Sequence, residues 1–225
     1  MAGRADQLRL RLARSLENAN PQGAHNALDE AFATLSLDAA LSEVVLPSVE
    51  MLTLDWAAIA PTGARIEFST GLLQTRLLAL ASGWDDGGSP TVVIAYPGAE
   101  PRALGGIAFA LALRERGWRI AYFGTGTPLG SALEVARAAD AQVVVVVARQ
   151  TADLAGPGRR GGDRRRLVLA GEGATATAAR ELGGELLPLH PILAARELHR
   201  RAGAGPGRPA SPQRSGRTPE VHSSL

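Results

Sequence analysis

The chain contains no cysteine and no lysine among its 225 residues. Without cysteine it can form no disulfide bond, thiolate metal site or cysteine nucleophile. Its apolar stretches, such as residues 143–148, are far too short to cross a bilayer. The first 20 residues show no apolar segment followed by a small-residue cleavage site, so we expect no signal peptide and a cytoplasmic location.

Several catalytic patterns are also missing from the sequence. It has no phosphate loop ending in Gly-Lys-Ser/Thr, no zinc-ligand spacing and no nucleophile–base pair. Asp55 and Glu100 are isolated carboxylates, so we expect no enzyme that works alone. The four histidines are His25, His190, His199 and His222. None of them lies in the two glycine-bearing loops described below, and surface positions without a metal are expected for all four.

The charge pattern gives weak evidence for nucleic-acid binding. The isoelectric point is about 9.9, but the formal net charge is only +2. Every basic side chain is arginine, whose high pKa inflates the isoelectric point. A composition rich in arginine, alanine and glycine is typical of a GC-rich genome. The arginine-rich stretch 156–166 lacks interleaved aromatic residues and is predicted to be a solvated loop.

Residues 6–82 are predicted to form a helical cap. Apolar side chains recur at helical spacing in four segments, residues 6–20, 22–35, 38–56 and 64–82. Pro47 should kink the third segment or start a new helix there, because proline cannot donate to the helical ladder. Four helices with short joints indicate a four-helix bundle, and residues 83–90 read as a linker.

Residues 91–200 alternate between strand and helix patterns. Strands are predicted at residues 91–96, 118–123, 142–148, 167–170 and 186–189, with helices at 103–116, 129–139, 174–182 and 191–199. This alternation is typical of an α/β domain with a Rossmann- or flavodoxin-like parallel sheet. Residues 201–225 have no hydrophobic period and are predicted to be a disordered tail.

Two glycine-bearing loops follow the first two strands. The first contains Gly98, Gly105 and Gly106, and the second is residues 124–127 (GTGT). Both begin at the carboxyl ends of strands, where open α/β sheets bind ligands. Glycine lets backbone or ligand approach closely. From these residues alone, short βα turns and a ligand site both remain possible.

This half of the chain resembles the cobalamin-binding domain of light-responsive, MerR-type transcription regulators and, more distantly, of methionine synthase. The family's Asp/Glu-x-His-x-x-Gly motif corresponds to residues 100–105 (EPRALG), with Arg102 at the histidine position. Its Gly-x-x-Thr-Pro-Leu element corresponds to residues 124–129 (GTGTPL). Its strand serine is replaced by Val147 or a neighbour, and its Gly-Gly pair reads Ala170-Gly171.

The helical half is similar to the cap of the same family. Trp56 stands where the family has a tryptophan that covers the upper face of the corrin, and Glu67-Phe68 stands at its Glu-His pair. Phe68 therefore replaces the histidine that can take the upper axial position after light breaks the cobalt–carbon bond. The resemblance extends from residue 8 to about residue 195.

The resemblance implies a corrinoid held between the cap and the loops at the strand ends. The implied contacts are Trp56, Glu67, Phe68, Glu100, Arg102, Gly105, Gly124, Thr127 and Gly171. Arginine has no lone pair for cobalt, and phenylalanine is apolar. The expected cofactor is therefore a cobalamin that these positions do not ligate through histidine, and that is bound through its ring, amides and nucleotide tail.

Alternatives remain for the ligand and for the role. Arg102 could pair with a carboxylate or phosphate of another tetrapyrrole, such as a bilin or porphyrin, or could be a surface arginine. We expect a sensory module that regulates transcription by oligomerising or by docking a partner. Few residues precede the cap, so the chain alone should not bind DNA specifically. The other hypotheses are a ligand-free scaffold and a corrinoid carrier for a methyltransferase. The carrier is the weakest, because carriers depend on the histidine that Arg102 replaces.

Overall fold

The structure is a computed structural model that describes residues 3–57, 63–84, 88–98, 104–155 and 165–203, and describes residues 53–57 and 63 by their backbone alone. It confirms the predicted α/β class, a helical cap followed by a Rossmann-like domain with a parallel sheet. Among the described helices, none is both long enough and apolar enough to cross a membrane. The predicted tail and the loop after the third strand lie largely outside the described residues.

The outer layer of the cap consists of α1 (Arg4–Glu17) and α2 (Pro21–Thr34), which pack against each other. Asn20 caps the start of α2, because its side chain accepts a hydrogen bond from the Gly23 N–H (3.0 Å). Pro21 is the first residue of α2. Leucines and alanines at helical spacing form the buried inner faces of both helices, as their sequence pattern predicts.

The inner layer of the cap is one continuous helical rod paired with α5 (Gly63–Ala79). The rod consists of α3 (Leu37–Ala39), the π-helix η1 (Ala40–Val45) and α4 (Leu46–Ala57). At the break predicted around Pro47, the π-helix η1 ends directly before α4. Pro47 lies in the first turn of α4, where proline is tolerated. Ser36 caps the start of the rod by accepting from the Ala39 N–H.

The second half forms a five-stranded parallel sheet with the order β2-β1-β3-β4-β5. The strands are β1 (Thr91–Tyr96), β2 (Arg119–Thr125), β3 (Val143–Val147), β4 (Arg166–Ala170) and β5 (Glu185–Leu186). The helices are α6 (Leu104–Glu115), α7 (Leu129–Ala138), the short 3₁₀ turn η3 (Thr151–Leu154), α8 (Ala176–Glu181) and α9 (Pro191–Gly203). β5 is shorter than the pattern at 186–189 predicts, and η3 was not predicted.

The central strands β1 and β3 are apolar on both faces because helices cover both faces of the sheet. One face packs against α6 and α9, and its core is continuous with that of the cap. The other face packs against α7 and α8. The chain therefore leaves β1 on one side of the sheet and enters β3 from the other, which opens a crevice at their carboxyl ends.

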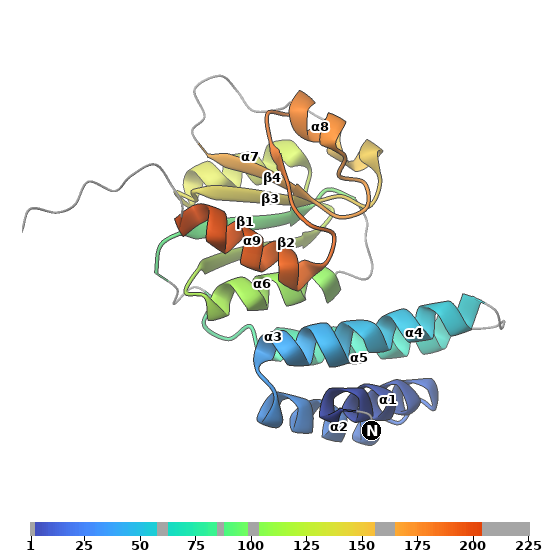
Figure 1. Cartoon of the computed structure of the whole chain (residues 1–225). Coiled ribbons are helices and arrows are strands. Elements are labelled where there is room, and N and C mark those ends of the chain that lie inside the picture. Colours follow the sequence, from blue (N-terminus) through green and yellow to red (C-terminus); the bar gives the residue numbers. More distant parts are fainter. Residues whose placement is uncertain (1–2, 58–62, 85–87, 99–103, 156–164, 204–225) are drawn as a thin grey trace, which may run out of the picture.

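The cap is docked on the α6 side of the α/β domain, with α5 against α6 (Figure 1). At the base of the rod, the Asp38 carboxylate accepts hydrogen bonds from Arg116 at the end of α6 (2.5 and 3.1 Å) and from Arg196 on α9 (2.9 Å). Figure 1 shows the other end of α4 extending past α6, on the side where the strands end. The cap is thus anchored at one end and overhangs the carboxyl edge of the sheet at the other.

Candidate functional site

A cavity of about 500 Å³ opens at the carboxyl ends of β1, β3 and β4, at the crevice that the strand order creates. The starts of α6 and α9 close it on the side of the cap. Its lining consists of Tyr96, Gly98, Gly105, Gly106, Phe109, Val147, Ala148, Arg149, Gln150, Asp153, Ala170, Gly171, Glu172, Pro188, Leu189, Pro191 and Ala194. Its size lies within the range of small-molecule and cofactor pockets.

Glycines hold the loops of this cavity at distances that a side chain would not allow. Gly171 has φ +90°, and a Cβ there would fall inside the contact distance of the Ala148 carbonyl oxygen. A Cβ on Gly173 would lie 2.5 Å from the backbone nitrogen of Gln150. The loop after β4 is therefore pressed against the loop after β3, and both positions require glycine.

The wall on the side of α6 is aromatic and apolar. Tyr96 at the end of β1 lies over Gly106, occupying the space that a side chain at that position would fill. Phe109 follows one turn later on α6, and Ala194 belongs to α9. Together these residues give this wall an apolar and aromatic surface, as is typical of pockets for small organic ligands.

Behind this wall the aromatic side chains continue away from the cavity. The ring of Tyr96 lies 6.2 Å from that of Tyr122, which in turn lies 5.4 Å from the ring of Trp84, both pairs edge to face. Burial raises the pKa of Tyr122 to about 12, so its phenol is neutral at ordinary pH. Trp84, from the predicted linker, therefore packs into the core and ties that segment to the sheet.

The polar end of the cavity is held by backbone hydrogen bonds. The Asp153 carboxylate accepts from the backbone N–H groups of Arg149 and Gln150, both at 2.9 Å. The same carboxylate lies against Gly98, where a Cβ would be 2.8 Å from it. Asp153 therefore holds the start of η3 against the end of β3 and against Gly98, just after β1. Among the described residues, no three histidine or carboxylate side chains gather to hold a metal ion.

Two of the residues implied by the resemblance come together at this cavity. Gly105 opens α6, and its missing side chain allows Pro191 at the start of α9 to approach, 3.3 Å from a Cβ placed there. Gly171 closes the opposite side. Glu100 and Arg102, which carry the altered ligand motif, lie outside the described residues.

Gly124 and Thr127, which the resemblance also implies, do not line the cavity. Gly124 (φ +55°) lies near the end of the edge strand β2, and Thr127 follows that strand. Thr127 donates its N–H to the Tyr96 carbonyl (2.9 Å) and its hydroxyl to the Phe123 carbonyl (3.0 Å). Thr127 thus fastens the loop after β2 to the end of β1.

The cap positions lie on the paired helices. Trp56 belongs to the last turn of α4, and its side chain is outside the described residues. On α5, Glu67 is exposed and Phe68 is half-buried. Both helices run along the side of the cap that overhangs the carboxyl edge (Figure 1). The proposed contact of these three residues with a ligand stays a prediction.

Sequence reasoning missed several lining residues, because nothing local marks them. Phe109 and Ala194 read as ordinary helix core, and Asp153 reads as a loop carboxylate. The stretch 188–191 (PLHP) offered a signal, since two prolines before a helix fix a loop at the sheet edge.

No protein-family model and no curated protein sequence matches the chain. Among solved structures, it is similar to the monomethylamine corrinoid protein of Methanosarcina barkeri, with a TM-score of 0.71 and 13% sequence identity over 87% of this chain and 98% of that chain. This likeness shows the fold.

Two other solved structures are similar at a TM-score of 0.42, which is too low to support an argument. One is a methanol:cobalamin methyltransferase complex from Methanosarcina barkeri, at 11% identity over 89% of this chain and 81% of that chain. The other is a cobalamin-binding protein from Desulfitobacterium hafniense, at 10% identity over 87% of this chain and 97% of that chain.

Proposed function

We propose that this chain binds a corrinoid, with one end of the ligand in the cavity and the rest at the carboxyl edge of the sheet, beside the cap. The observation that carries the proposal is the cavity held open by Gly105, Gly171 and Gly173 at the crevice between β1 and β3. The fold that contains it, cap included, matches nearly the whole length of a corrinoid protein.

The residues present fit such a ligand. The cavity offers apolar and aromatic walls at Tyr96, Phe109 and Ala194, which suit a flat heteroaromatic group such as the nucleotide tail. Glycine backbone at 171 and 173 offers close approach without side-chain collision. The cavity is too confined to take a whole macrocycle together with its tail, so the macrocycle belongs outside it, at the edge that the cap overhangs. A bound corrinoid supplies a cobalt centre that can exchange an axial ligand.

The protein's own contribution is to bind, orient and shield. The loops after β3 and β4 position the buried end of the ligand, since Asp153 and the glycines leave them little freedom. The cap, anchored through Asp38, limits the access of water to the exposed end. Residues Trp56, Glu67 and Phe68 are the cap positions expected to contact the macrocycle.

We further propose that the role is regulatory and not catalytic. Two described carboxylates line the cavity, Asp153 and Glu172, and Asp153 is committed to two backbone N–H groups, which leaves Asp153 unsuited to acid–base work. Ligand binding beneath an overhanging cap is suited to changing oligomer state or docking a protein partner, as in transcriptional regulation.

A second candidate role is a corrinoid carrier for a methyltransferase. The observation that favours it is the extent of the structural match, which covers 98% of the monomethylamine corrinoid protein. Methyl transfer from a methylated amine or alcohol to the loaded protein, in the presence of a candidate methyltransferase, would support the carrier. A loaded protein that changes its oligomeric state and accepts no methyl group would support the regulator.

The binding proposal is tested by mixing the purified chain with adenosylcobalamin, methylcobalamin or hydroxocobalamin in the dark, desalting it and recording its absorption spectrum. We expect about one corrinoid per chain. Ala194→Phe, which fills the cavity from α9, should abolish retention. Leu193→Phe is the matched control, because Leu193 is the adjacent α9 residue and is 51% exposed to solvent.

The two variants make the outcome specific. Retention by the wild type and the Leu193 variant, with loss in the Ala194 variant, assigns the ligand to this cavity. A colourless wild-type protein with all three corrinoids rejects corrinoid binding and leaves the ligand-free scaffold or another tetrapyrrole. Equal retention by both variants rejects the cavity as the binding site.

A further inference from the structure

A fully buried tryptophan and a solvent-exposed histidine share one hydrogen bond between β2 and α9. Trp118, the residue before β2, is fully buried, and its indole N–H donates to Nδ1 of His199 (3.1 Å). His199 lies near the end of α9 and is exposed to solvent. An indole N–H can only donate, and a buried donor without an acceptor is costly. The His199 imidazole therefore supplies the acceptor that burial of Trp118 requires.

This geometry defines the protonation state in which the bond exists. A neutral imidazole has one donor and one acceptor nitrogen, so Nδ1 accepts from Trp118 only while the proton sits on Nε2. An imidazolium carries a hydrogen on both nitrogens and would turn an N–H toward the indole N–H. Histidine is the side chain whose charge ordinarily changes between pH 5 and pH 8, and solvent reaches this ring. Mild acid therefore converts the hydrogen bond into a contact between two donors.

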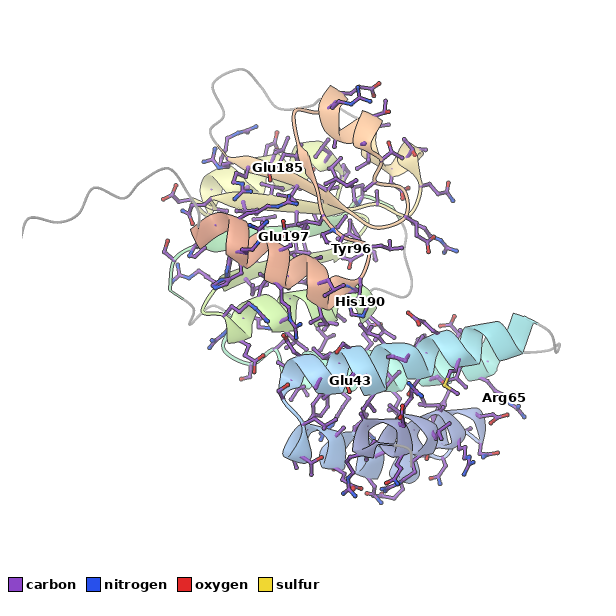
Figure 2. All side chains as sticks on the ribbon, viewed as in Figure 1. Glu43, Arg65, Tyr96, Glu185, His190 and Glu197 are labelled. Carbon is purple, nitrogen blue, oxygen red and sulfur yellow. The ribbon has the colours of Figure 1, made fainter. Side chains whose placement is uncertain are left out.

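The carboxylates around this end of α9 stay ionised over that pH range. The hydrogen bond from Arg200 lowers the pKa of Glu197, on α9, to about 2. The hydrogen bond from Arg166 holds the pKa of Glu185, on the adjacent β5, below its usual range, and Arg201 bridges the two carboxylates (Figure 2). Arginine stays charged throughout, and carboxylates ordinarily ionise below pH 5. The remaining charged residues on α9 and on the nearby parts of the cap, α6 and β2 are Asp38, Arg114, Glu115, Arg116, Arg119 and Arg196.

The helix that this bond fixes carries part of the cavity and part of the cap anchor. Pro191 and Ala194, at the start of α9, line the cavity. In the next turn, Arg196 donates to the carboxylate of Asp38 in the cap (2.9 Å). The buried side of α9 packs against α6. Loss of the indole bond would therefore loosen one wall of the cavity together with one of the two arginines that hold the cap.

We propose that the hydrogen bond from Trp118 to His199 is an acid-sensitive latch, in which protonation of the imidazole frees α9 and opens the cavity wall that α9 provides. The latch is built into the chain itself and needs no bound ligand, so it goes beyond the proposed corrinoid binding. At pH 8 the neutral imidazole accepts and α9 is fixed. As the pH falls toward 5 the stabilisation is lost, because only the neutral imidazole can accept.

The first measurement follows the Trp118 indole N–H in the ligand-free full chain, labelled with ¹⁵N. Its ¹H–¹⁵N resonance, identified by its absence from Trp118→Phe, should shift between pH 8 and pH 5 in the wild type. His199→Asn is the matched variant, because its amide oxygen stands near the position of Nδ1 and accepts at every pH; its indole resonance should not move. His25→Ala, which removes a histidine from the outer layer of the cap, should behave as the wild type.

The second measurement follows the buried side of α9. The chain has no cysteine, so Ala195→Cys places a single thiol at a fully buried position of that helix. Its rate of reaction with dithiodipyridine is compared with and without His199→Asn at each pH, which cancels the effect of pH on the thiol. Losing one buried hydrogen bond changes an opening equilibrium by about 5–30-fold. The ratio of the two rates should rise by about this factor from pH 8 to pH 5.

Three results would overturn the latch. The indole resonance of the wild type could stay fixed between pH 8 and pH 5, or it could move equally in His199→Asn, which would assign the change to another group. A resonance that moves while the ratio of thiol rates stays constant would show that α9 remains in place when the bond is lost. Because the ligand-free chain is used throughout, these results leave the corrinoid proposal to its own retention assay.

Discussion

The ion-paired Asp38 at the base of the cap offers the sharpest test of how the two halves are joined. Its side chain is 11% exposed, and the Arg116 side chain that it binds is 19% exposed. Asp38→Asn leaves this guanidinium without its counter-charge in a poorly hydrated place. Removing one partner of a fully buried pair costs roughly 3–5 kcal/mol, and of an exposed pair about 0.2–1 kcal/mol. Because the Asp38–Arg116 pair is only partly exposed, we expect Asp38→Asn to lower the unfolding free energy by about 2 kcal/mol.

The assay is urea or thermal unfolding, in which a chain of this size loses about 2–4 °C per kcal/mol, or about 4–8 °C in total. Asp29→Asn is the matched control, because Asp29 pairs with Arg76 on the surface and is 57% exposed. It should cost no more than about 1 kcal/mol. Equal effects of the two substitutions would refute the view that Asp38 anchors the cap.

The pH dependence provides an independent check on Asp38. Burial raises the pKa of its carboxyl, but the hydrogen bonds from Arg116 and Arg196 outweigh burial and hold that pKa below its usual range. The stabilisation is therefore complete above the unfolded-state pKa of about 3.9 and is lost as the pH falls through the lower folded-state pKa. The difference in unfolding free energy between wild type and Asp38→Asn should have its full size at pH 7. It should shrink as the pH falls below the unfolded-state pKa of about 3.9. A difference independent of pH would contradict this assignment.

Four further outcomes are expected. Gly171→Ala should lower the unfolding free energy by about 1–3 kcal/mol and reduce corrinoid retention, because φ is +90° and a Cβ would collide with the Ala148 carbonyl. Gly71→Ala, in open space on α5, should instead raise the unfolding free energy by about 0.5–1 kcal/mol. In an ultraviolet phenolate titration, Tyr122 should ionise near pH 12, and Tyr122→Phe should remove that step. Trp56→Ala should weaken corrinoid retention in the desalting assay, and unchanged retention would remove Trp56 from the site.

The helices and strands followed from local patterns in the sequence. Asn20-Pro21 ends one cap helix and opens the next because asparagine caps and proline lacks an N–H to donate. The run of five valines at 143–147 predicted a central strand, since a strand covered by helices on both faces needs no polar side chains. The strand predicted at 186–189 is observed as the two-residue β5 (Glu185–Leu186), because Pro188 has no N–H to donate to the sheet.

The candidate site depended on contacts between residues far apart in the chain. Gly105 and Gly171 were implied by the resemblance, which gave no reason to choose Phe109, Asp153 or Ala194. The aromatic contact between Trp84 and Tyr122 was equally hidden. Helical or strand periodicity shows that a side chain is buried, and says nothing about which distant side chain it meets.

The sequence by itself therefore determined the order of the elements, the helical cap, the parallel sheet and the loops where a ligand could bind, because these follow from periodicity, caps and turn residues over short distances. The tertiary structure decided which loops meet in one cavity and how Asp38 ties the cap to α6 and α9. These depend on the strand order and on the packing of the two halves, which bring together residues up to 158 positions apart.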